Sequence, residues 1–171
     1  MKRCMELLLL CALCCFLAGC AKTYHGTDEL TEKAREEIPI ADADTIDMQY
    51  AGMCCADEKA IAWFISGNEY QAHYYLPMEI EVKAGSADYT YIRTYKPMER
   101  GRDIAVLQWN DSYLFLINNP DCVAVKITDA QGVREIAIEK DAYPYVFSYD
   151  IDRSSSAFTY AFLDGDGNEI A

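Results

Sequence analysis

The sequence is poor in the residues and motifs that carry out common enzymatic reactions. Only two of its 171 residues are histidines, His25 and His73. It contains no Gly-x-Ser-x-Gly, His-Glu-x-x-His or Ser-x-x-Lys motif and no glycine-rich phosphate loop. Carboxylates are plentiful, but no two stand out as the paired acid and base of a glycosidase. The sequence therefore predicts a protein that is not an enzyme and uses no cofactor.

Positive charge and long hydrophobic runs are also scarce. The chain has 15 Lys and Arg residues against 28 Asp and Glu residues, for a net charge of −13. This balance argues against binding to nucleic acid or to anionic lipid headgroups, both of which attract basic segments. The one marked apolar run, Leu7 to Phe16, is shorter than the roughly 20 residues that a membrane-spanning helix needs.

That apolar run belongs to an N-terminal export signal. Lys2 and Arg3 precede it, and Leu17-Ala18-Gly19-Cys20 follows it. The segment resembles the lipobox of bacterial lipoproteins. The resemblance implies removal of residues 1–19 and acylation of Cys20, which would hold the protein on the extracytoplasmic face of the cell membrane through the lipid bilayer. A plain signal peptide cut elsewhere, or a single membrane helix, is the alternative.

Residues 20–45 are polar and are expected to form an acidic tether. Thr27 is a suitable N-cap for a short helix ending at Glu37, with Leu30, Ala34 and Ile38 along one side. A helix of about a dozen residues is marginal alone in water. As a flexible coil of some 25 residues, the tether would reach about 25–30 Å from the membrane.

Residues 46–171 show the pattern of a single antiparallel β-sandwich, of immunoglobulin-like or jelly-roll type. Short apolar or alternating runs recur at about 8–12 residue spacing, separated by turn residues. Connections this short exclude parallel crossovers. This part resembles small, uncharacterised β-rich lipoproteins. Strands are expected near residues 60–66, 70–76, 78–82, 88–95, 104–109, 113–118, 122–128, 133–139, 145–151 and 157–163.

Tyrosines are the first candidate binding residues. The chain has 13, and Tyr89, Tyr91 and Tyr95 fall on one face of an expected strand. Such a face could bind a protein partner or stack against sugar rings, because each tyrosine ring has an apolar face and a polar tip. Alternatively, the rings are there because tyrosine favours half-buried strands. Trp63 and Trp109 are expected in the core.

Besides Cys20, three cysteines remain after export: Cys54, Cys55 and Cys122. An oxidising compartment permits a disulfide from one of the adjacent pair to Cys122, and three free thiols are the alternative. A thiol redox role is a third hypothesis. A zinc site would need four Cys or His ligands, and only His73 adds to the cysteines within residues 46–171.

The C-terminal segment Asp164 to Glu169 alternates oxygen ligands with glycine, as calcium loops do. Asp164, Asp166 and Asn168 are the candidate metal ligands. An EF-hand loop, however, needs Gly at its sixth position and Glu at its twelfth, and neither is present. A glycine-rich hairpin turn explains the same residues.

These features together predict a lipid-anchored, extracytoplasmic module that binds rather than transforms its target. The expected partner is a protein of the cell envelope. The alternatives are a structural lipoprotein with a calcium-modulated C-terminal loop, a carbohydrate-binding module and a thiol redox protein.

Overall fold

The computed structural model describes residues 22–39, 45–67, 74–99, 103–151 and 158–170. Its strands pair antiparallel in three sheets. Sheet A has the order β1 (Thr23–His25), β5 (Asp88–Thr94), β4 (Tyr74–Val82), β3 (Lys59–Ser66) and β2 (Met48–Ala56), with β6 (Met98–Glu99) also paired to β4. Sheet B has the order β11 (Tyr145–Asp150), β8 (Ser112–Ile117) and β7 (Ile104–Trp109). Sheet C has the order β10 (Gly132–Ala137), β9 (Ala124–Asp129) and β12 (Thr159–Leu163).

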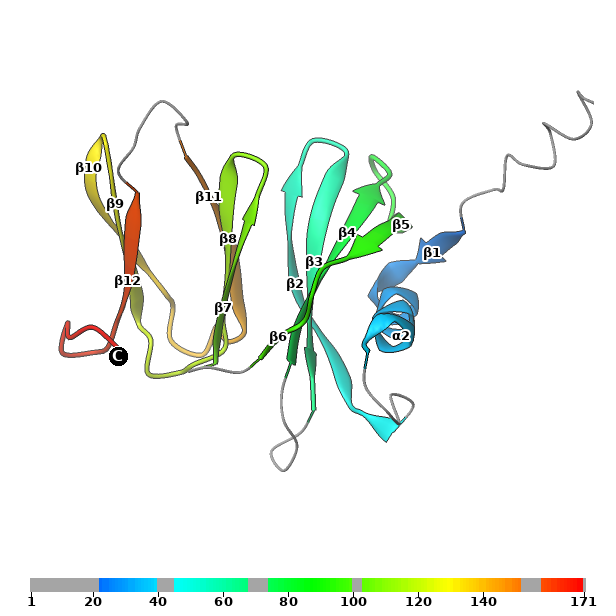
Figure 1. The fold of residues 1–171 in the computed structure, drawn as a ribbon, viewed down its shortest axis with the longest axis horizontal. Helices are drawn as coiled ribbons and strands as arrows, with labels where there is room; N and C mark the ends of the chain where they lie inside the picture. The colour runs from blue at the N-terminus through cyan, green and yellow to red at the C-terminus, as the bar shows by residue number, and fades with distance from the viewer. Residues whose placement is uncertain (1–21, 40–44, 68–73, 100–102, 152–157, 171) are drawn as a thin grey trace, which may run out of the picture.

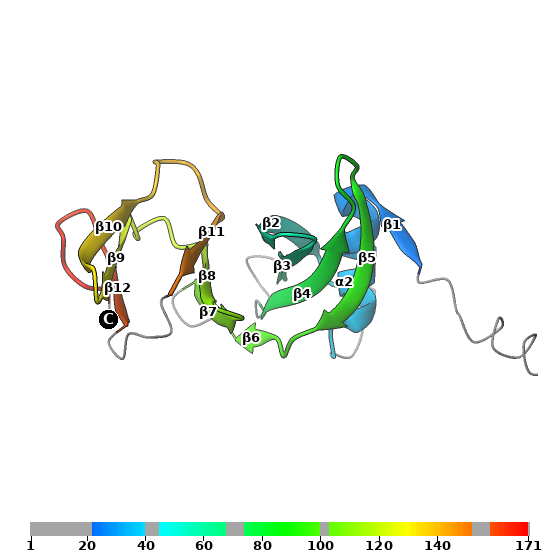
Figure 2. The same cartoon turned by 90° about the horizontal axis from the view of Figure 1, so that it is seen from above.

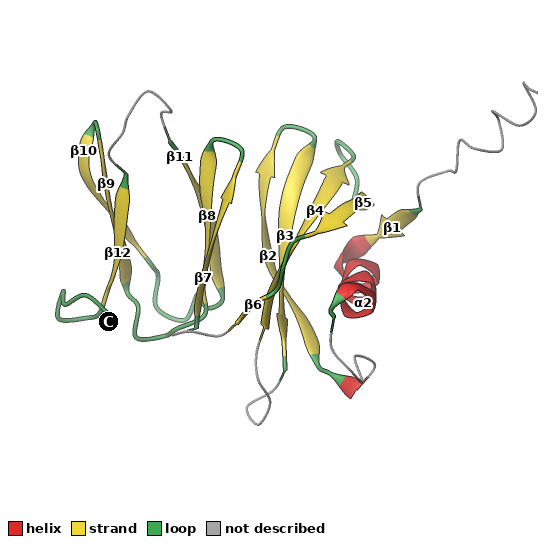
Figure 3. Ribbon diagram, viewed as in Figure 1, coloured by secondary structure: helices red, strands yellow, loops and turns green. Residues whose placement is uncertain are grey.

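The sheets stack as successive layers, which confirms the expected all-β, antiparallel sandwich class. The helix α2 (Gly26–Glu37) covers one face of sheet A, and sheets B and C follow on the other side (Figure 1, Figure 3). Sheet A curls around α2 (Figure 2). The hairpins β7–β8 and β9–β10 start sheets B and C, and β11 and β12 then complete them in turn.

Two central strands are buried on both faces, because each lies between two layers. Alternate side chains of a strand point to opposite faces, so such a strand is apolar almost throughout. In β3, the side chains that pack with α2 are Ala60, Ala62 and Phe64. The alternate side chains face sheet B and are Ile61, Trp63 and Ile65. In β8, Leu114 and Leu116 face sheet A. The alternate side chains, Phe115 and Ile117, face sheet C.

The segment expected to be a tether is folded over most of its described length. The short helix forms as expected, but Leu30, Ala34 and Ile38 are buried in the core beneath it. Apolar burial against sheet A supplies the stabilisation that an isolated helix of this length lacks. The expectation of a flexible tether is therefore corrected for Thr23 to Ile38.

Irregularities in sheet A explain where the strand expectations differ from the structure. β4 runs through Pro77 as one strand, although two strands broken near that residue were expected. Pro77 has no N–H to donate, and it lies where β5 ends and β6 begins on the neighbouring side. The strand β2 was not expected, since a bulge between Tyr50 and Gly52 disturbs its alternation.

Candidate functional site

The structure separates the three tyrosines that were expected on one face. Tyr89 is buried and Tyr91 half-buried, and both pack in the core between sheet A and α2. Tyr95 packs instead with the core between sheets A and B. A β-bulge causes the difference: Tyr91 pairs with Ile80, but Arg93 pairs with Glu79, so one extra residue reverses the later side chains. The prediction of a shared tyrosine face is wrong.

Tyr95 belongs to a polar network built on a buried carboxylate. Glu79 is only 4% exposed, in the middle of β4. Its Oε2 accepts hydrogen bonds from Arg93 Nε at 2.6 Å and from the Tyr95 hydroxyl at 2.8 Å. Arg93 also donates to the Tyr95 hydroxyl at 2.7 Å, and Lys59 Nζ lies 3.8 Å from Glu79 Oε1. The network satisfies the buried charge and fixes the orientation of the Tyr95 ring.

The electrostatics of this network favour the ionised carboxylate. Burial alone would raise the pKa of Glu79, but the hydrogen bonds from Tyr95 and Arg93, together with the charges of Arg93 and Lys59, hold it below its ordinary value. Burial and the hydrogen bond to Glu79 raise the pKa of Tyr95, which keeps its hydroxyl a donor. Glu79 and Arg93 were not singled out from the sequence. Met78 to Val82 alternates apolar and acidic residues, and nothing in that alternation distinguishes the buried Glu79 from the exposed Glu81.

A groove of about 560 Å³ adjoins this network. It is lined by Tyr95, Lys96, Pro97, Met98 and Leu107. The first four follow one another from the end of β5 into β6, and Leu107 comes from β7 of the next sheet. Met98 and Leu107 are partly buried against the core between sheets A and B, while Lys96 is exposed. The groove therefore joins two layers of the fold, with an apolar floor and a cationic rim.

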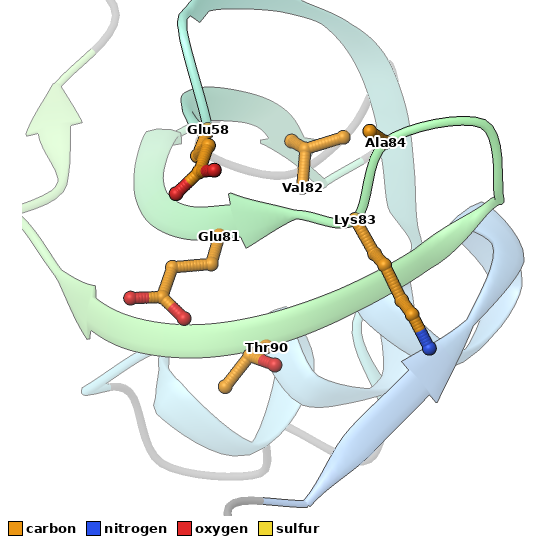
Figure 4. Close-up of a pocket in the computed structure, with 6 residues that line it drawn as sticks. All are labelled: Glu58, Glu81, Val82, Lys83, Ala84 and Thr90. Carbon is orange, nitrogen blue, oxygen red and sulfur yellow. The ribbon is translucent and has the colours of Figure 1, made fainter.

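A second hollow, of about 320 Å³, lies at the hairpin end of sheet A (Figure 4). Figure 4 shows the carboxylates of Glu58 and Glu81 on one side, with the Lys83 ammonium extending away from them. Val82, Ala84 and Thr90 complete its lining. These side chains are small or charged, so this hollow offers little apolar surface to a partner.

The three cysteines are free thiols in separate environments. Cys54 is buried between sheets A and B, Cys122 is buried between sheets B and C, and Cys55 is exposed. The disulfide alternative is therefore not the state of this structure. Burial raises the pKa of Cys54 to about 12, with a smaller contribution from Cys55, and burial also raises the pKa of Cys122. Neither buried thiol is set up as a nucleophile, since the thiolate is the reactive form.

The C-terminal loop adopts the hairpin-turn geometry. Asp164 Oδ1 accepts hydrogen bonds from the backbone N–H of Asp166 at 2.9 Å and of Asn168 at 2.8 Å. Gly167 has a φ of +81°, which glycine adopts without strain. The Asp164 carboxylate thus organises its own turn, and its pKa is lowered first by the bond from the Asn168 backbone. Among the described residues, no three or more His, Cys, Asp or Glu side chains group as a metal site would require.

The export signal with its lipobox, residues 1–20 including Cys20, and His73 lie outside the described residues. Within the described ranges, no helix combines the length and apolar character needed to cross a bilayer.

Comparison with known proteins gives no match: no protein family, curated protein or solved structure is similar to this chain.

Proposed function

We propose that this protein is a lipid-anchored, extracytoplasmic module that binds a protein of the cell envelope without catalysing a reaction. The anchor is the acylated Cys20, supported by the resemblance of Leu17 to Cys20 to a lipobox. Two acyl chains give stable membrane attachment, whereas one gives only marginal binding.

The groove lined by Tyr95, Lys96, Pro97, Met98 and Leu107 is the observation that carries the binding proposal. Aromatic residues and methionine are enriched where proteins meet. The Tyr95 ring lies 4.7 Å from Arg93 Cζ and hydrogen-bonds to Glu79, so it is already fixed before a partner arrives. A fixed ring loses little conformational entropy on binding, which favours affinity.

The charge around the groove indicates the chemistry of the partner. Lys96 makes no ion pair with the described residues, whereas Arg93, which lies over the Tyr95 ring, is paired with Glu79. Lys96 therefore supplies the positive charge of the rim, on a chain whose net charge is −13. A protein segment that presents an apolar side chain next to a carboxylate would match both the floor and the rim.

The test is photo-crosslinking in cells, with a photoreactive residue placed at Lys96 and, as a control, at the exposed Lys140 outside the groove. We expect the Lys96 position alone to give a discrete adduct, which mass spectrometry then identifies. Identical products at both positions, or none at Lys96, would contradict the groove as the binding site.

A charge-reversal pair sharpens this test. Lys96→Glu should lower recovery of the partner by about tenfold or more, since it places like charges opposite one another at the rim. Lys140→Glu makes the same change at an exposed position outside the groove and should leave recovery unchanged.

A further inference from the structure

The described chain is already part of the fold at its first residues. Thr23, Tyr24 and His25 pair with Thr90, Tyr89 and Asp88 of β5, respectively. Tyr24 is only 6% exposed, and the Lys22 ammonium lies 4.8 Å from the centroid of its ring. No flexible spacer therefore separates Lys22 from sheet A.

The helix that follows holds β1 in place. Gly26 N–H donates to Ala87 O at 2.8 Å, at the turn from β1 into α2. His25 Nδ1 lies 2.8 Å from Asp88 Oδ1, and the backbone N–H of His25 donates to Glu29 Oε2 at 2.8 Å. At the other end of α2, the Tyr91 hydroxyl donates to Glu37 Oε2 at 2.9 Å. Detaching β1 would break its pairing with β5 and the contacts of His25 and Gly26, while the Tyr91–Glu37 bond holds α2 itself against β5.

The length of chain between the lipid and the fold is then very short. Cys20 and Lys22 are two residues apart, and extended chain spans at most about 3.3–3.6 Å per residue, or roughly 7 Å in all. The flexible tether expected from the sequence would have reached about 25–30 Å. The difference decides how far the folded part can move from the bilayer.

We propose that the layer formed by β1 and α2 faces the phospholipid surface directly, and that sheet C is the outward end of the molecule. This inference rests on the proposed anchor at Cys20. Figure 1 shows the order of the layers: α2 and β1 at the N-terminal end, then sheets A, B and C. Packed sheets lie about 10 Å apart, so sheet C stands about 20 Å beyond sheet A.

The surface of α2 is acidic, so charge does not draw this layer to the bilayer. Its exposed side chains are Asp28, Glu29, Glu32 and Glu36, and Lys33 is paired with Glu36 and Glu37. The approach to the phospholipid surface follows instead from the short connection between Cys20 and β1. The large exposed hydrophobic side chains among the described residues, Val123, Val133 and Tyr160, all lie at the sheet C end, away from this surface.

The experiment measures proximity to the bilayer with the lipidated full chain in phosphatidylcholine vesicles that contain a nitroxide headgroup lipid. A fluorophore is attached at Glu36→Cys in α2 or at Val133→Cys in β10, each in a Cys55→Ser background that removes the exposed native thiol. We expect the nitroxide to quench the α2 label several-fold more than the β10 label. Equal quenching of the two labels overturns the proposal.

A matched variant carries a 20-residue Gly/Ser insertion directly after Ala21, which adds about 25 Å of flexible reach. Quenching at Glu36→Cys should then fall to the level of the β10 label. An unchanged value would mean that the short connection does not set the distance, and would also overturn the proposal. Intact mass shows whether Cys20 carries lipid. Absence of lipid on Cys20 overturns both the anchor and this inference. An acylated protein with equal quenching at the two labels overturns the orientation alone.

Discussion

At the residue scale, Glu79 makes the stability of the fold depend on pH. Its pKa in the folded protein lies below the ordinary value of 4.5, so the unfolded chain binds a proton more readily than the folded one. The stability that this carboxylate contributes is present above about pH 4.5 and is lost as the pH falls through the lower, folded-state pKa. We expect Glu79→Gln to lower the free energy of unfolding at pH 7 by about 1–3 kcal/mol.

Urea unfolding of the wild type and of Glu79→Gln between pH 7 and pH 3 checks this prediction. The difference in free energy of unfolding between the two proteins should shrink toward pH 3, because the wild type loses the contribution of the ionised Glu79, which the variant already lacks. Glu81→Gln is the matched control, since Glu81 is exposed on the same strand. If Glu79→Gln lowered the free energy of unfolding by the same amount at every pH, the stabilisation by this network would come from side-chain shape rather than from the charge of Glu79.

Cysteine reactivity follows burial at the same scale. In the folded protein, a thiol reagent should modify Cys55 at once and leave Cys54 and Cys122 unmodified, because both are buried and both have a raised pKa. Intact mass after brief alkylation counts the modified thiols, and Cys55→Ser should abolish the early product. After unfolding in denaturant, all three should react. Early modification at Cys54 would contradict the packing of β2 against sheet B.

At the element scale, Gly52 forms the bulge that lets β2 pass close to β11. Its φ is +142°, and a Cβ there would lie 3.2 Å from both Cβ and Cγ2 of Val146. Gly52→Ala should therefore cost about 1–3 kcal/mol, through backbone strain and the close approach. Gly165→Ala is the control, since no φ constraint applies and its Cβ would meet nothing within 4 Å. Thermal unfolding that gave equal midpoints for the two variants would rule out this account of the bulge.

Local patterns predict the elements of this chain well where alternation is regular. The segments that became β3, β7, β8, β9, β10 and β11 were expected close to their observed bounds. The helix α2 ends at Glu37 as expected, but its N-cap is His25, two residues before the expected cap Thr27. The burial of Leu30 and Ala34 could not be foreseen, because it depends on sheet A, whose strands lie further along the chain. An amphipathic helix has the same sequence whether it is packed or free.

The candidate site was less predictable than the fold, for a specific reason. A single bulge between Tyr91 and Arg93 moved Tyr95 to the opposite face of sheet A and into the groove. Period-two counting cannot anticipate an extra residue, which reverses every later side chain. Leu107 joins the groove only through the stacking of sheets A and B, a long-range contact that no local pattern encodes.

At the scale of the whole molecule, β8 connects two cores. Its Leu114 and Leu116 belong to the core between sheets A and B, and its Phe115 and Ile117 to the core between sheets B and C. Both tryptophans of the chain, Trp63 and Trp109, are buried in the first of these cores. Tryptophan fluorescence therefore reports the packing of sheets A and B, while far-UV circular dichroism reports all three sheets.

This separation of signals allows a test of whether the layers unfold together. Phe115 stacks on Phe147 at 4.7 Å and meets Tyr160 edge-on at 5.3 Å, so Phe115→Leu should cost about 1–3 kcal/mol in the core between sheets B and C. Since β8 is shared, we expect the tryptophan and circular dichroism midpoints to fall by the same amount. Lys126→Gln, on the exposed side of β9, should move neither. A circular dichroism transition that shifts while the tryptophan midpoint stays fixed would show that sheet C unfolds independently of sheets A and B.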